Sequence, residues 1–165
     1  MFQNPYSSKK AASVMEILVV ITIITIALTS ILKLVSFSLR ASTLIKQTHQ
    51  ANNITQETIE QVRNFRDGTN WNTDGLGALN VSTDYYIQKS GSPLQWQLSE
   101  GTETTEGFTQ RVVFENVMRD GNDNIVLAGG INDPDTRRVI AAVSWQERGK
   151  NHQIELSTYL TNWKQ

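Results

Sequence analysis

The chain has 165 residues, which leaves room for one anchor helix and one small domain. Its 15 basic and 16 acidic side chains give a net charge of −1, which excludes the concentrated basic surface that nucleic acid binding requires. The absence of cysteine excludes a disulfide, a thiolate metal site and a cysteine nucleophile.

The first predicted element is a long apolar stretch, KKAASVMEILVVITIITIALTSILKLVSFSL, at residues 9–39. An unbroken run of apolar or hydroxylic residues extends from Ile17 to Leu32, and roughly 20 apolar residues span a bilayer as a helix. Serine and threonine are compatible with such a span because their hydroxyls can bond back to a helix carbonyl. The stretch therefore predicts a membrane-spanning helix.

Glu16 is the only acidic residue in this stretch. An ionisable side chain inside a membrane costs about 3 kcal/mol at the centre and commonly has a function there. A simpler interpretation places Glu16 at the membrane interface, where it only marks the end of the span. Spacing alone does not separate these two interpretations.

Residues 13–28, SVMEILVVITIITIAL, resemble the start of type IV pilins and type II secretion pseudopilins. In that family a basic leader and a small residue precede a pattern such as FTLIELLVVIAIIGIL. On this pattern Glu16 matches the glutamate at the fifth position of the mature chain. Ala12 then becomes the first mature residue, and Ala11 the residue before the cleavage site. The resemblance covers about the first third of the chain.

The resemblance implies a leader, residues 1–11, whose basic part is Lys9 and Lys10. A prepilin peptidase would cut between Ala11 and Ala12, and the same enzyme would N-methylate Ala12. The cut removes both lysines and creates an amine at the mature N-terminus. The family pairs this amine with its glutamate, in the same or an adjoining subunit, when helices pack in a filament.

The chain departs from the family pattern at several positions. Ala11 stands where the family prefers glycine, and Ala12 where an aromatic residue or methionine is usual. Thr25 and Lys33 stand where major pilins often carry glycine and proline, so nothing local interrupts the helix. A lysine in place of proline, together with the lack of the cysteines that close a loop in many pilins, favours a minor pilin or a pseudopilin.

A conventional secretory signal is an alternative interpretation of the N-terminus. Its apolar core would be about 7–15 residues long and would end at an A-x-A-like site. The run here is longer, and no such site follows it. Positive charges lie on both sides of the run, with Lys33, Arg40 and Lys46 after it, so orientation depends on the resemblance rather than on charge.

Residues 40–66 are predicted to form an amphipathic second half of the same helix. Their apolar face contains Leu44, Ala51, Ile54, Thr58, Ile59, Val62 and Phe65. No proline occurs between Tyr6 and Ser92, and Asp67-Gly68 supplies a stop signal. We therefore expect one helix of about 50 residues, about 75 Å long. Residues 12–39 would be its transmembrane or filament-core half.

Residues 67–165 are predicted to form loops and an antiparallel sheet on which the amphipathic half packs, giving a pilin-like α+β fold. We expect Ile54, Val62 and Phe65 to bury against strands that carry Val143 and Trp145. Alternating or β-branched residues predict strands at residues 85–89, 94–98, 108–119, 125–128, 139–145 and 154–160. Residues 100–107 and 129–135 are expected to be loops. The ending from Val143 to Trp163 resembles the closing hairpin of V-type minor pilins and I-type minor pseudopilins.

Chemical motifs are sparse, and we expect no enzyme, no cofactor and no metal site. His49 and His152 are isolated in the sequence. Asp120, Asn122 and Asn124 alternate like the first ligands of a calcium loop, but its glycine and distal glutamate are missing, which favours a plain hairpin turn. The four tryptophans are expected in the core or at its rim.

The resemblance implies a structural subunit of a type IV pilus-like or type II secretion filament. The subunit would be held in the cytoplasmic membrane by a single span, with residues 67–165 outside the cytoplasm, and an inner-membrane platform would assemble it with other subunits. One alternative is a single-pass membrane-anchored extracytoplasmic binding domain. A secreted enzyme with an unfamiliar site is a second alternative.

Overall fold

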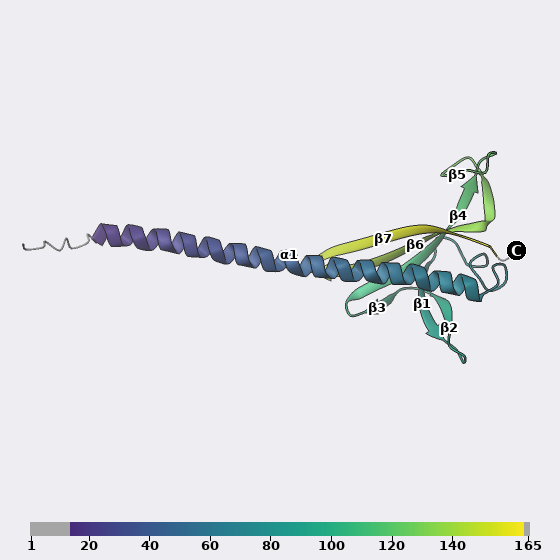
Figure 1. Ribbon diagram of the computed structural model, residues 1–165, viewed down its shortest axis with the longest axis horizontal. Coiled ribbons are helices and arrows are strands. Elements are labelled where there is room, and N and C mark those ends of the chain that lie inside the picture. Colours follow the sequence, from purple (N-terminus) through teal and green to yellow (C-terminus); the bar gives the residue numbers. More distant parts are fainter. Residues whose placement is uncertain (1–13, 164–165) are drawn as a thin grey trace, which may run out of the picture. The chain divides into compact units, whose positions relative to one another are not determined.

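In the computed structural model, which describes residues 14–163, the first element is the helix α1, Val14–Gly68 (Figure 1). Its 55 residues form one unbroken helix, as the sequence predicts. The chain divides into two compact units, Met1–Leu44 and Ile45–Gln165, so α1 contributes to both.

In the first unit, α1 is stabilised by its own backbone and by its hydroxyl side chains. Every residue from 14 to 40 is exposed. Five hydroxyls donate hydrogen bonds of 2.7–3.0 Å to the carbonyl four residues earlier: Thr22, Thr25, Ser30, Ser36 and Thr43. The expected back-bonding of serine and threonine is confirmed, and it lets polar residues sit on an apolar helix without an unpaired hydroxyl.

In the second unit, α1 buries one stripe of side chains against the sheet: Ala51, Thr55, Thr58, Ile59, Val62 and Phe65. The predicted face is correct at Ala51, Thr58, Ile59, Val62 and Phe65. Leu44 and Ile54 are only half-buried, and Thr55 is buried in place of Ile54. Buried residues on one face of a helix are spaced by three or four residues, because a helix repeats every 3.6 residues. Thr55, four residues after Ala51 and three before Thr58, therefore lies on the buried face. Thr55 can be buried because its hydroxyl donates to the Ala51 carbonyl at 2.8 Å.

Within residues 14–163, seven strands form one antiparallel sheet. In chain order they are β1 Asp84–Ser90, β2 Gln95–Glu100, β3 Glu103–Thr105, β4 Phe108–Arg119, β5 Ile125–Val126, β6 Ile131–Glu147 and β7 Lys150–Thr161. The spatial order is β2-β1-β4-β6-β7, and β3 and β5 each pair with β4. The chain is therefore an α+β protein with a long N-terminal helix packed on an antiparallel sheet.

The hairpin between β6 and β7 is closed by a two-residue turn. Glu147 pairs with Lys150, and the two residues between them, Arg148 and Gly149, have φ values of 49° and 79°. Two successive positive φ angles match the type I′ turn, whose twist follows that of the flanking strands. The predicted return of the chain at this point is confirmed.

Three expectations about the loops and strands were wrong. The expected loop at residues 100–107 contains β3, which pairs with the start of β4. The expected loop at residues 129–135 belongs mostly to β6, and the expected strand at residues 125–128 is only the two-residue β5. The alternation of residues did not predict the start of β6 because the strand contains a bulge. Asp133 pairs with Val117 and Arg137 with Asn116, so the three residues between them, which include Pro134, do not pair with β4.

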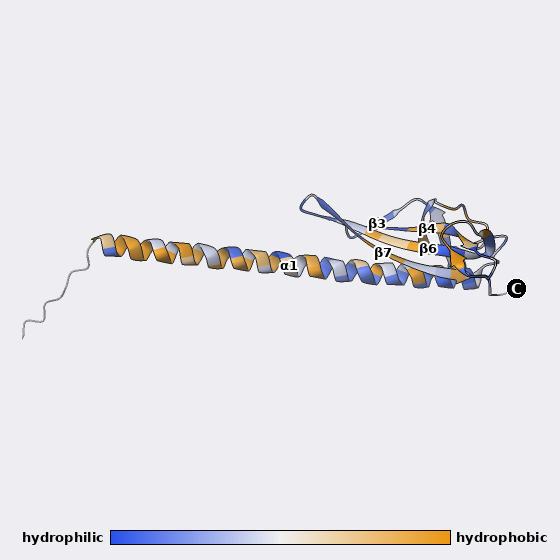
Figure 2. Cartoon of the chain, turned by 90° about the horizontal axis from the view of Figure 1, so that it is seen from above, coloured by the Kyte–Doolittle hydropathy of each residue, from blue (hydrophilic) through white to orange (hydrophobic). Residues whose placement is uncertain are grey.

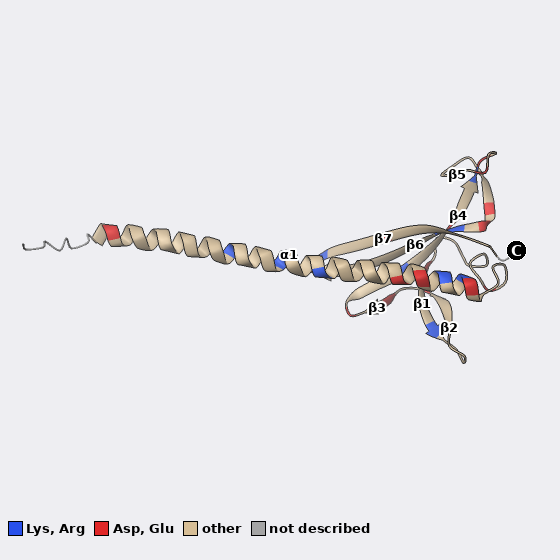
Figure 3. Cartoon of the chain, in the orientation of Figure 1, with Lys and Arg blue, Asp and Glu red and all other residues tan. Residues whose placement is uncertain are grey.

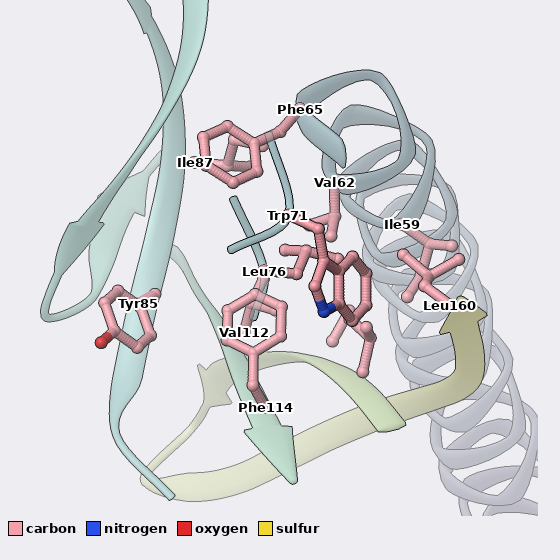
Figure 4. Packing of buried hydrophobic residues seen from close by; sticks show 12 residues of the cluster. Ile59, Val62, Phe65, Trp71, Leu76, Tyr85, Ile87, Val112, Phe114 and Leu160 are labelled. Atoms are coloured by element: carbon pink, nitrogen blue, oxygen red, sulfur yellow. The ribbon is translucent and has the colours of Figure 1, made fainter. Parts of the chain in front are cut away.

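The core lies between α1 and the sheet (Figure 4). Val62 and Phe65 belong to a cluster with Val139 and Ala141 of β6, rather than with Val143 and Trp145, the strand residues expected opposite them. The remaining members of the cluster are Ile59, Trp71, Leu76, Tyr85, Ile87, Val112, Phe114 and Leu160. A hydrogen bond explains why the contacts differ from those expected. The Thr58 hydroxyl lies 3.4 Å from the Gln110 side chain, and Gln110 pairs with Val143 of β6. Val143 therefore lies beside the helical turn that contains Thr58, one turn before Val62.

Candidate functional site

Glu16 lies in the first turn of α1, and its side chain is exposed. A carboxylate is favoured there by the partial positive charge at a helix N-terminus. The other predicted site residues, Lys9, Lys10, Ala11 and Ala12, lie outside the described residues. Cleavage, methylation and the pairing of Glu16 with the Ala12 amine therefore stay predictions.

The surface of α1 around and beyond Glu16 is apolar on all sides. Each large hydrophobic side chain from Val14 to Leu39 is about half exposed or more. None of the residues in the most apolar stretch of α1 is buried. Figure 2 shows the change from this apolar part to the mixed second half, and Figure 3 shows that charges are dense only in the latter. By length and composition, α1 can span a membrane.

The turn that resembles part of a calcium loop is occupied by its own hydrogen bonds. One carboxylate oxygen of Asp120 accepts the backbone N–H groups of Asn122 and Asn124, each at 2.9 Å. Hydrogen bonds from Asn124, first from its backbone and then from its side chain, lower the pKa of Asp120. Asp120 therefore organises the hairpin turn between β4 and β5, which is the plainer of the two predicted roles.

The four tryptophans occupy different environments. Trp71 is in the core, and its indole N–H donates to the Pro134 carbonyl at 3.0 Å. Trp145 is buried between Phe108 and His152, with His152 stacked at a ring distance of 5.3 Å. Trp96 is half-buried beneath the Lys89 ammonium, and Trp163 is exposed. Core or rim positions are confirmed for Trp71, Trp145 and Trp96 but not for Trp163, and the four rings form no single stacking surface.

Metal-ligating side chains do not gather in the part of the chain that the structure describes. Within residues 14–163 no three side chains of His, Cys, Asp or Glu lie close enough to hold a metal ion. His49 lies on α1, and His152 faces Trp145 in a strand pair. Within residues 14–163 neither histidine hydrogen-bonds a carboxylate or a hydroxyl, and His152 stacks on the Trp145 ring.

Sequence reasoning missed a polar network beside the bulge of β6. The Arg119 guanidinium donates to Asp133 at 2.7 Å, and this contact raises the pKa of Arg119. Burial raises the pKa of Asp133, but hydrogen bonds from Thr136 and Arg119 outweigh it and leave that pKa lowered. Arg137, which is buried, donates to Asn116 at 2.8 Å and to the Gly77 carbonyl at 3.2 Å. No spacing in the sequence indicates this network, because the bulge of β6 brings its side chains together.

Sequence reasoning also missed a cavity of about 540 Å³ at the C-terminal end of α1. Its lining comes from three separate parts of the chain: the end of α1 with the loop after it, the bulge of β6, and the segment that ends β7. Such a cavity depends on which segments the fold brings together. It therefore has no signature in a local sequence pattern.

The apolar first half of α1, with Glu16 at its start, is the strongest functional feature among the described residues. Comparison with known proteins adds no relative to this observation. No protein-family model, no curated protein and no solved structure matches the chain.

Proposed function

We propose that this protein is a structural subunit, a minor pilin or pseudopilin, of a type IV pilus-like or type II secretion filament. The observation that carries the proposal is the contrast within α1. Residues 14–39 are apolar on every side and exposed, with Glu16 as the only acid, whereas residues 45–68 are buried along one stripe on a sheet. The resemblance of residues 13–28 to the start of pilins supports the same conclusion.

A helix that is apolar all round needs an apolar environment on every side. Lipid supplies it while the subunit is stored in the membrane, and neighbouring helices supply it in a filament. The same surface therefore serves both states. The globular unit stays outside the cytoplasm and needs no change of fold between them.

Leader cleavage would couple the two states. Cutting between Ala11 and Ala12 removes Lys9 and Lys10 and leaves an amine four residues before Glu16. In a bundle of apolar helices an unpaired carboxylate or amine is costly, and removing one partner of a buried pair costs about 3–5 kcal/mol. Pairing Glu16 with the Ala12 amine of a neighbour therefore favours docking of processed subunits. A prepilin peptidase and an inner-membrane platform are the partners this route requires.

A second candidate is a single-pass membrane-anchored domain that binds a ligand outside the cytoplasm. The position of Glu16 favours it, because an exposed carboxylate in the first turn is stabilised by the helix dipole without any partner. In this case Glu16 marks the membrane boundary, and the leader need not be cut.

Intact mass spectrometry of the protein extracted from membranes tests the proposal. We expect a mass that lacks residues 1–11 and carries one added methyl group. Cells without prepilin peptidase should contain the full-length chain instead. Ala11→Gly should be processed at least as well as the wild type, whereas Ala11→Trp should block the cut. Finding Met1 on the protein extracted from membranes of cells that contain prepilin peptidase would contradict the proposal and favour the anchored domain.

A further inference from the structure

The cavity at the C-terminal end of α1 has the size of a small-molecule site and a mainly polar lining. Its volume of about 540 Å³ lies within the range of roughly 300–1,000 Å³ that is typical of ligand pockets. The lining residues are Arg66, Thr69, Asn70, Trp71, Asn72, Asp135, Thr161, Asn162 and Trp163. All of them belong to the globular unit that begins at Ile45.

Two indole rings border this cavity, and the protein holds both of them in place. The Trp163 indole N–H donates to an Asp67 carboxylate oxygen at 3.1 Å, while 60% of the residue remains exposed. Trp71 is 5% exposed, and its N–H is bonded to Pro134. Because the polar edge of Trp163 is fixed, its ring offers a flat apolar surface at the rim whose orientation is already set.

The polar groups of the cavity offer both donors and acceptors. The Arg66 guanidinium bonds Asp67 through Nε, and its terminal nitrogens bond no other described residue. The Asn70 amide oxygen accepts the Asn72 backbone N–H, which leaves the two donors of that amide available. On the strand side, one oxygen of Asp135 accepts the Asn162 side-chain N–H at 2.9 Å, so the second oxygen of Asp135 remains as an acceptor.

The balance of charge selects among ligand classes. Asp67 and Asp135 lie at or beside the cavity and disfavour an anion, while Arg66 disfavours a cation. A hydroxyl group both donates and accepts, so it suits a lining in which donors and acceptors alternate. A sugar ring adds apolar C–H groups on one face, which pack against a flat aromatic ring.

We propose that this cavity binds a neutral saccharide, with one sugar ring packed on Trp163 and its hydroxyls bonded to the amides of Asn70 and Asn72 and to Asp135. This inference is independent of cleavage and filament assembly, because every residue in it belongs to the globular unit. It adds a glycan-binding activity to a protein for which we otherwise propose a structural role.

Isothermal titration of the full chain with maltotriose, cellotriose and chitotriose tests the proposal. The protein is kept in a detergent without a sugar head group, because a maltoside detergent would itself compete for the cavity. We expect at least one of the three probes to bind saturably, with a dissociation constant on the order of 1 mM or tighter. Absence of saturable binding by all three probes would overturn the proposal.

Two variants locate the binding. Trp163→Ala should weaken the binding of the active probe by about tenfold, the usual upper size of an aromatic stacking contribution. Asn72→Ala removes an exposed amide whose side chain bonds no other described residue, and it should weaken binding several-fold. Tyr159→Ala is the matched control, because Tyr159 is also an exposed aromatic residue, at 45%, but lies outside the cavity lining.

The pattern across these variants decides the outcome. Weaker binding by both cavity variants with unchanged binding by Tyr159→Ala supports the site. Wild-type affinity in both cavity variants, or an equal loss in the Tyr159 control, would overturn it. Because Trp163 and Asn72 are both exposed, the far-ultraviolet circular dichroism of each variant should match the wild type.

Discussion

The two parts of α1 have the same backbone but different surroundings. Phe37, in the first unit, is 70% exposed, whereas Phe65, in the second, is 6% exposed. Both parts use the same local device, a hydroxyl bonded to the carbonyl four residues earlier, at Thr22 in one and Thr55 in the other. The local helix bonding is therefore alike in the two parts, and the pattern of apolar residues decides what covers each part.

The difference in exposure between the two parts of α1 indicates which part requires contact with other molecules. The stripe that contains Ala51, Thr55 and Val62 is covered by the sheet of the same chain. The apolar residues of the first half have no such cover among the described residues. Large exposed apolar surfaces mark contact with a membrane or another protein. The following four predictions use this contrast.

The largest effect is expected at Glu16. If Glu16 pairs with the Ala12 amine of a neighbour, Glu16→Leu should leave membrane insertion and cleavage intact but lower filament incorporation. Loss of one partner of a buried pair costs roughly 3–5 kcal/mol, which is more than a hundredfold at equilibrium. Counting subunits in sheared filaments measures it. Glu16→Gln keeps the size of the side chain and should show a similar loss.

Normal incorporation of processed Glu16→Leu would refute the pairing and leave Glu16 as a marker of the membrane boundary. Thr25→Val is the matched control, because it changes the same apolar half of α1 without a charge. Its incorporation should equal that of the wild type.

The next effect concerns the two phenylalanines. Phe65→Ala should lower the free energy of unfolding of the globular unit by about 3–5 kcal/mol, because it leaves a cavity in the core. Phe37→Ala should change it by less than about 0.5 kcal/mol, since Phe37 is exposed and belongs to the other unit. Urea unfolding in detergent, followed by tryptophan fluorescence, compares the two. Equal effects would mean that the two parts of α1 are not distinct.

A smaller effect is expected from the two threonines. Thr55→Val replaces a buried hydroxyl, and loss of its bond to the Ala51 carbonyl should cost about 0.5–1.5 kcal/mol of unfolding free energy. Thr22→Val removes the equivalent bond from an exposed turn of the first unit, so the same urea experiment should show no change. A loss of unfolding free energy for Thr22→Val as large as that for Thr55→Val would contradict the separation of α1 into an exposed and a buried part.

The smallest effect is a dependence on pH that belongs to the globular unit alone. The pKa of Asp133 is lowered in the folded protein, so the ionised form is favoured by folding. Its contribution is present above the unfolded pKa of about 3.9 and is lost as the pH falls through the lower folded pKa. We expect a loss below about 1 kcal/mol, because water screens the pair with Arg119.

Unfolding of wild type and Asp133→Asn between pH 5 and pH 2 measures this contribution, as a difference that shrinks as the pH falls. A difference that does not change with pH would mean that ionisation of Asp133 does not stabilise the fold. The exposed half of α1 should behave alike in both proteins.

Some of this architecture could be read from particular residues. The absence of proline between Tyr6 and Ser92 predicts the unbroken helix, and β4 has the predicted bounds, residues 108–119. The turn at Arg148 and Gly149 could be anticipated because alternating residues end and resume around it. The start of β6 could not be anticipated, because a bulge containing Pro134 breaks the alternation on which strand prediction depends.

The candidate site was predictable to a different degree in each unit. Glu16 and the apolar run are local features, so the sequence marks them directly. The cavity beside Trp163 was not predictable, because Arg66, Asp135 and Asn162 are far apart in the chain and meet only in the fold. The core partners of Val62 and Phe65 were misplaced along β6 for the same reason.

The sequence by itself determined the helix, the change along it from an apolar to an amphipathic part, and the α+β class. These follow from helix propensity and from the period of apolar residues, which act between neighbours in the chain. Only the tertiary structure decided the level at which α1 meets β6, the bulge that places Arg119 against Asp133, and the cavity beside Trp163. These depend on the register between segments distant in sequence, which packing and hydrogen bonding select only when the sheet is complete.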